Sequence, residues 1–229
     1  MAAASDVKVL GMWACPYVNR VQLALCITSI EYEFIEENTL QKSDMLLKHN
    51  PVLKKIPVLI HGHKSVCESC IIVEYIADAF DTGPRILPSD AYDRALARFW
   101  AAYIDDKWYP LVKVLRQSDN EEERKLLVQK LSEGLILLEE AFIGCSKGMA
   151  YFGGDSIGYL DIILGSCLAW LRVTEKVVGV ELMDPTKAPQ LAKWAERLCS
   201  DNRVKAVFPN FDRLMELHEL IQAYLKSSK

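Results

Sequence analysis

The chain has 229 residues, a length that can bury one large core or two small ones. Its 31 acidic and 27 basic residues give a net charge of −4 with no basic cluster, which argues against nucleic acid as a partner. No apolar run is long enough to span a membrane, and residues 1–6 lack the basic and apolar regions of a secretory signal.

Strands and helices are predicted to alternate in the first 80 residues. The apolar, β-branched run at 7–11 predicts a strand, and the apolar spacing from Val18 to Cys26 predicts a helix. The further predictions are a strand at 32–36, a short helix at 42–48, a strand at 56–60, a turn at Gly62, a return strand near 64–67 and a helix at 69–80. This βαβαββα order requires one parallel crossover and one hairpin.

Beyond Ser89 only helices are predicted. One helix follows Ser89 or Asp90 as its cap and carries apolar residues from Tyr92 to Tyr103. The others are expected at 127–142, 161–173, 189–199 and 211–225. Glycine and prolines in the preceding segment mark a linker. We therefore expect an α/β domain at 1–82, a linker at 83–88 and an all-helical domain at 89–229.

Cys15 lies between the first predicted strand and helix, and Pro16 suits the first helical turn. Unpaired N–H groups at a helix N-terminus favour an anion, here the thiolate of Cys15 or of a bound thiol. We expect the helix end to lower the pKa of an accessible Cys15. The alternative is an inert, half-buried thiol.

Two other segments have two interpretations each. Proline in Ile56-Pro57 marks either an edge strand or a cis bond that presents the backbone of Ile56 to an extended ligand. Glu68 and Ser69 begin the last helix of the α/β domain. They are either capping residues or, together with the helix end, ligands for the carboxylate and ammonium groups of a bound molecule.

Over nearly its full length the chain resembles a plant tau-class glutathione transferase. The segments that carry the resemblance are short but specific in order and spacing, and they lie at 13–17, 50–52, 54–59, 67–69, 97–100, 105–107 and 151–155. Gly158-Tyr159-Leu160-Asp161 also matches the family's capping box, with Gly158 in place of the usual Ser or Thr.

The resemblance implies a thioredoxin-like domain joined to an all-α domain, in a cytosolic homodimeric enzyme that transfers glutathione to apolar electrophiles without a metal. Pro57 would be cis, and Ile56 would pair with the cysteinyl backbone of glutathione. Glu68 and Ser69 would hold its γ-glutamyl end, with Lys42 and Lys55 at the glycine carboxylate. The implied acceptor site contains Met12, Trp108, Tyr109, Lys113, Trp170, Leu214 and His218.

One departure from the family concerns the reaction itself, because tau enzymes usually have serine where this chain has Cys15. A serine hydroxyl stabilises the glutathione thiolate, whereas a cysteine is itself a nucleophile that exchanges with disulfides. We therefore expect thiol-transferase activity through Cys15, alongside or instead of conjugation. Val18 occupies the place of a second redox cysteine, so the exchange would use one thiol. The alternative from another class is a ligandin that carries apolar metabolites without turnover.

Seven scattered cysteines in a chain of this size predict reduced thiols in the cytosol. Cys67 and Cys70 have the spacing of a redox or zinc pair. Zinc would need further ligands, for which His61 and His63 are the nearest. A regulatory disulfide is a second alternative, and two packed thiols are the simplest interpretation.

Overall fold

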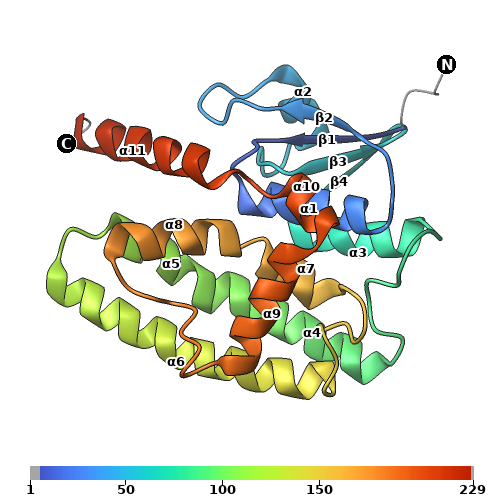
Figure 1. The fold of residues 1–229 in the computed structure, drawn as a ribbon. Coiled ribbons are helices and arrows are strands. Elements are labelled where there is room, and N and C mark those ends of the chain that lie inside the picture. The colour runs from blue at the N-terminus through green and yellow to red at the C-terminus, as the bar shows by residue number, and fades with distance from the viewer. Residues whose placement is uncertain (1–5, 228–229) are drawn as a thin grey trace.

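The computed structural model describes residues 6–227 and places an α/β domain against a bundle of helices (Figure 1). The first domain contains β1 (Val7–Gly11), α1 (Pro16–Ile27), β2 (Glu33–Glu36), α2 (Asp44–His49), β3 (Val58–His61), β4 (Lys64–Cys67) and α3 (Ser69–Ala79). The sheet order is β2-β1-β3-β4, with β1 parallel to β2 and antiparallel to β3. The predicted crossover and hairpin are both confirmed.

Helices cover both faces of this sheet. Leu46 of α2 packs with Leu10, Val58 and Ile60 on the outer face. Helices α1 and α3 lie on the other face, between the sheet and the helical domain (Figure 1). Helix α1 is covered on both sides, so it buries even polar residues such as Asn19 and Arg20. The Asn19 amide donates to the Val207 carbonyl at 2.7 Å.

The second domain is helical throughout, as predicted. Its elements are α4 (Ala91–Tyr103), the π-helical turn η1 (Ile104–Trp108), α5 (Tyr109–Gln117), α6 (Glu121–Ser146), α7 (Tyr159–Gly165), α8 (Leu168–Val178), α9 (Pro189–Ser200), α10 (Asn202–Val207) and α11 (Phe211–Ser227). Asp90 caps α4 by accepting from the backbone N–H groups of Tyr92 and Asp93. Within residues 6–227, no helix has the length and apolar character that crossing a membrane requires.

The single helix predicted at 161–173 is wrong, because the structure has α7 and α8 there instead. The Cys167 N–H bonds the Leu164 carbonyl three residues back at 3.0 Å. The Ser166 hydroxyl also donates to the Ile163 carbonyl at 2.8 Å, which satisfies a carbonyl at the break. Apolar periodicity alone does not reveal this bend, since the residues on both sides of it are buried.

Asp161 fixes the start of α7. Its buried carboxylate accepts from the backbone N–H groups of Phe152, Gly153 and Gly158 at 2.8–2.9 Å. The Trp194 indole of α9 donates to it as well, at 2.6 Å. The predicted capping role of Asp161 is therefore confirmed, and the same carboxylate also joins the 152–158 loop to α9.

Candidate active site

Strand register places the candidate residues at one edge of the sheet. Leu10 lies opposite Val58, and Val58 lies opposite Cys67, so β1 and β4 end where β3 begins. Cys15 follows β1, Ile56 and Pro57 precede β3, and Glu68 and Ser69 follow β4. The parallel strand β2 ends at this edge too, and Lys42 lies in the loop after it.

Cys15 is the N-cap residue of α1 and is partly exposed. Burial raises the pKa of its thiol above the ordinary value, while the backbone N–H groups of Val18 and Tyr17 and the charge of Arg20 lower it by less. The expected net lowering of this pKa is therefore wrong for the structure as it stands. Desolvation of the thiolate outweighs the favourable field of the helix end.

Glu68 and Ser69 do not cap α3 with their side chains. Glu68 is the N-cap residue at φ +71°, a left-handed conformation that is unusual for a residue other than glycine, and its side chain makes no capping hydrogen bond. Its carboxylate is exposed at the helix start. The buried Ser69 hydroxyl accepts instead from Arg20 Nη1 at 3.1 Å. A left-handed residue with an uncommitted carboxylate is typical of a binding site.

The Ile56–Pro57 peptide is cis, as the resemblance implied. Ile56 lies outside the strand ladder, which begins at Val58. The preceding loop is held by buried Asn50, whose amide donates to the Lys55 carbonyl at 2.8 Å and whose oxygen accepts from the Leu53 N–H. The side chain of Lys55 is exposed beside this edge.

Hydrogen bonds of the neighbouring Ser43 hold the loop that carries Lys42. Glu37 is buried and accepts from the Ser43 hydroxyl at 2.6 Å, next to Lys42 in sequence. Ser43 in turn caps α2 by accepting from the Leu46 N–H. Lys42 itself is exposed, so its ammonium group is free to meet an anion at the sheet edge.

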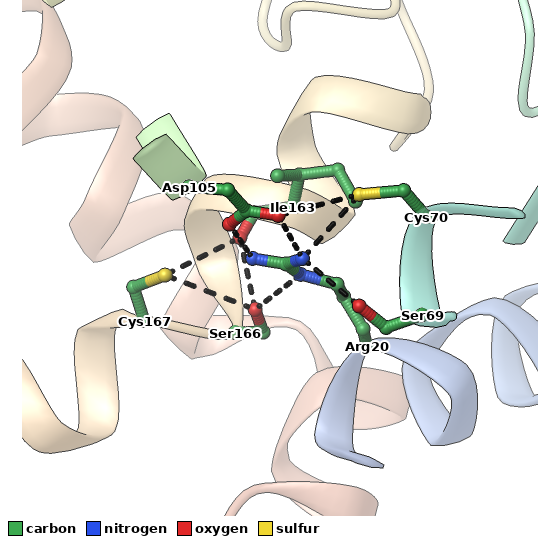
Figure 2. A network of polar contacts seen from close by, with 7 residues as sticks. All are labelled: Arg20, Ser69, Cys70, Asp105, Ile163, Ser166 and Cys167. Atoms are coloured by element: carbon green, nitrogen blue, oxygen red, sulfur yellow. Dashed lines mark hydrogen bonds and ion pairs between the residues drawn. The ribbon is translucent and has the colours of Figure 1, made fainter. Parts of the chain in front are cut away.

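An ion pair with a fully buried arginine lies next to Ser69 (Figure 2). Arg20 has no exposed side-chain surface and makes two hydrogen bonds to Asp105, at 2.7 and 2.6 Å. The same guanidinium reaches Ser69 and Cys70 of α3 and the Ser166 hydroxyl at 3.2 Å. The sequence reasoning did not identify Arg20, because its partners are far away in the chain. The network ties both domains to the start of α3.

Two of the predicted acceptor residues contact the segment around Cys15. The Trp170 indole donates to the Ala14 carbonyl at 2.6 Å, which places α8 against the residue before Cys15. The Tyr109 ring packs edge-on against Tyr17 with centroids 6.4 Å apart. Met12 is partly buried in the same loop, Lys113 is exposed on α5, and His218 is buried on α11.

Two acceptor predictions are wrong, because Trp108 and Leu214 belong to the core. Trp108 is 1 % exposed, and its indole donates to the Leu131 carbonyl at 3.1 Å. It packs against Gly134, where an added Cβ would lie 2.5 Å from the ring, so only glycine fits there. Leu214 has no exposed surface. Neither side chain presents surface to an acceptor.

The sequence analysis did not single out Arg116. Its guanidinium carbon lies 4.1 Å from the centre of the Trp170 ring, and its Nη1 donates to the Thr174 hydroxyl at 3.4 Å. The spacing of three residues from Lys113 on α5 is the only sequence signal that relates Arg116 to the predicted site.

Cys67 and Cys70 have separate partners. The Cys67 thiol donates to the His49 carbonyl at 3.6 Å, and the Cys70 thiol to Asp105 at 3.5 Å. His61 bonds the Tyr75 hydroxyl at 2.9 Å and stacks on Phe80. All seven cysteines are free, and within residues 6–227 no group of His, Cys, Asp and Glu side chains is arranged to hold a metal ion. The contacts favour two packed thiols over zinc or a disulfide.

Two cavities lie away from this edge, against the segment that joins the domains. Their volumes are about 720 and 430 Å³, and Arg85, Ile86, Leu87 and Pro88 line both. None of the candidate residues named above lines either cavity. The candidate residues lie instead at the sheet edge, where the strand register brings them to one side of the domain.

Comparisons with known proteins identify the family of the chain. Residues 5–78 match the model of the glutathione S-transferase N-terminal domain, and residues 89–197 match that of the C-terminal domain. Glutathione S-transferase U17 of Arabidopsis thaliana is 54% identical over 220 residues, which are 96% of this chain and 97% of that protein.

Two solved structures are also similar. A tau-class glutathione S-transferase from mango, Mangifera indica, has a TM-score of 0.91 and 53% identity, and the match covers 95% of this chain and 99% of that one. A rice glutathione transferase solved in complex with glutathione has a TM-score of 0.87 and 32% identity, with 96% and 100% covered.

Proposed function

Since the chain belongs to the plant tau class of the glutathione S-transferase family, we propose that it binds glutathione at the sheet edge and transfers it through chemistry that involves Cys15. The single observation that carries this proposal is the position of Cys15 as the N-cap of α1, at the edge that also presents Glu68, Ser69 and Ile56.

The residues at this edge fit the charges of the tripeptide. The exposed Glu68 carboxylate suits the ammonium of the γ-glutamyl group, and the N–H groups at the start of α3 with the Ser69 hydroxyl suit its carboxylate. Because Ser69 accepts from Arg20, its own hydrogen is available to a ligand and is polarised. Ile56 offers unpaired backbone to the cysteinyl unit, and the cations of Lys42 and Lys55 suit the glycine carboxylate.

Cys15 supports a two-step thiol exchange. Its thiolate attacks the glutathione sulfur of a mixed disulfide, so a Cys15–glutathione disulfide forms and the substrate leaves as a thiolate. A second glutathione thiolate then attacks the same glutathione sulfur, which releases oxidised glutathione and restores Cys15. In conjugation, the glutathione thiolate instead displaces a leaving group from an electrophile, and Cys15 only contacts its sulfur.

Intact-mass analysis after incubation with oxidised glutathione tests the role of Cys15. We expect one adduct on the wild type and none on Cys15→Ser. Cys26→Ser is the matched control, since Cys26 is also partly exposed and burial also raises its pKa, but it does not begin a helix. An adduct that persists on Cys15→Ser would contradict the exchange mechanism.

Conjugation is measured on the same variants with chlorodinitrobenzene. We expect Cys15→Ser to conjugate faster than the wild type, because a hydroxyl is the better hydrogen-bond donor to the glutathione thiolate. A fall to background would show that Cys15 itself supports conjugation. If neither reaction occurs while an apolar ligand still quenches tryptophan fluorescence, the protein is a carrier.

We also propose a homodimer in the cytosol. Helix α4 exposes Tyr92 by 70% and Phe99 by 60%, and the loop before β3 exposes Val52 by 85%. Such apolar surface is typical of an interface. The free thiols of all seven cysteines suit a reducing compartment. Sedimentation should give a dimer for the wild type and a monomer for Phe99→Asp, and a wild-type monomer would contradict the assembly.

A further inference from the structure

Arg116 is an unpaired cation among the acceptor residues. Within residues 6–227 no carboxylate forms an ion pair with it, and its guanidinium donates one hydrogen bond, the long one to Thr174 at 3.4 Å. Arg20, another arginine near this region, is by contrast paired with Asp105 at 2.6 Å. A guanidinium that is partly withdrawn from water and lacks an anion retains most of its donors for a ligand.

The neighbours of Arg116 do not neutralise its charge. Burial raises the pKa of Tyr109 well above its ordinary value, so this phenol is neutral. Burial and then the nearby Arg116 charge lower the pKa of His218, which is therefore neutral near pH 7. On α8, Glu175 accepts from the Leu182 and Met183 N–H groups instead.

The cation also lies beside a side chain that contacts the segment of Cys15. The guanidinium carbon of Arg116 is 4.1 Å from the centre of the Trp170 ring. The Trp170 indole contacts Ala14, next to Cys15, and Tyr109 packs on Tyr17. A partly buried guanidinium without an anion, close to the segment of Cys15, suits an acceptor that carries a carboxylate.

We propose that Arg116 makes the acceptor site selective for acceptors that carry a carboxylate, which the guanidinium binds. This inference rests on the proposed function, because it assumes that acceptors bind on this side of Cys15. It names the substrate class for that site, which the glutathione-binding residues leave open.

Steady-state kinetics with two matched electrophiles test the selectivity. Chloronitrobenzoate carries the carboxylate, and chloronitrobenzamide has nearly the same shape without the charge. We expect Arg116→Gln to lower kcat/KM for the benzoate about tenfold or more and to change the benzamide by less than about threefold. Arg116→Lys keeps the charge but not the planar fork, so it should fall between.

The matched control is Arg213→Gln. Arg213 stacks on Trp13 at the same 4.1 Å as Arg116 on Trp170, but it is exposed on α11. We expect Arg213→Gln to leave the ratio of kcat/KM for the benzoate to kcat/KM for the benzamide unchanged. Equal losses for benzoate and benzamide in Arg116→Gln would overturn the proposal, since Arg116 would then act on the fold or on the transition state. So would an equal effect of Arg213→Gln.

Calorimetric binding of naphthoate and naphthamide, with saturating glutathione present, separates this inference from the proposed function. We expect Arg116→Gln to weaken naphthoate about tenfold and to leave naphthamide unchanged. That result without any turnover would support the anion site while the enzymatic proposal fails. Turnover with naphthoate binding unaffected by Arg116→Gln would overturn the anion site and leave the proposed function intact. Weaker glutathione binding in place of weaker naphthoate binding would also overturn it.

Discussion

The buried pair of Arg20 and Asp105 gives the sharpest test of how this fold is held together. Asp105→Asn keeps the shape of the side chain and removes its charge, so the fully buried Arg20 guanidinium loses its counter-ion. Removing one partner of a buried pair lowers the free energy of unfolding by about 3–5 kcal/mol. For a chain of this length we expect the melting temperature to fall by roughly 6–20 °C.

An exposed pair provides the matched control. Arg98 and Glu74 also form a two-pronged contact, at 3.2 and 2.5 Å, but their side chains are 49% and 25% exposed. Glu74→Gln should therefore lower the free energy of unfolding by about 0–1 kcal/mol. Both variants are unfolded thermally and in urea beside the wild type. If the two midpoints lie within about 2 °C of each other, burial does not set the strength of these pairs and the reasoning is refuted.

Three further predictions follow from the same contacts. Because burial raises the pKa of Cys15, its alkylation by iodoacetamide should quicken about tenfold per pH unit from pH 7 to about pH 9, and a plateau below about pH 8 would contradict this. Asp161→Ala leaves three backbone donors and the Trp194 indole without their acceptor, so the free energy of unfolding measured in urea should fall by about 3–5 kcal/mol. A fall of less than about 1 kcal/mol would contradict this prediction. Burial and then the charge of Arg116 lower the pKa of His218, so its protonation below about pH 6.5 favours the unfolded chain. The free energy of unfolding of His218→Gln should therefore fall less between pH 7 and pH 5 than that of the wild type. Equal falls would show that protonation of His218 does not affect stability.

Local patterns in the sequence were enough for the order of elements and for the position of the thiol. The apolar run at 56–60 and the turn at Gly62 predicted the β3–β4 hairpin, which the structure confirms. Pro16 predicted the start of α1, and therefore Cys15 at its N-terminus. These signals work because strand pairing across a short turn and helix initiation depend on neighbouring residues.

Long-range packing decided what each predicted acceptor side chain contacts. Trp108 and Trp170 both carried the aromatic signal of an acceptor site, but Trp108 packs on Gly134 while Trp170 contacts Ala14. Apolar periodicity predicts that a side chain is buried, but it does not indicate which residues the side chain contacts. The sequence alone thus cannot separate the two tryptophans.

The sequence by itself determined the α/β-then-helical architecture and the place of Cys15 at the start of a helix. The tertiary structure decided the pKa of Cys15, the pairing of Arg20 with Asp105 across 85 residues and the unpaired state of Arg116. The reason is physical: helices form from local hydrogen bonds and propensities, whereas desolvation and charge pairing depend on which distant segments are brought into contact.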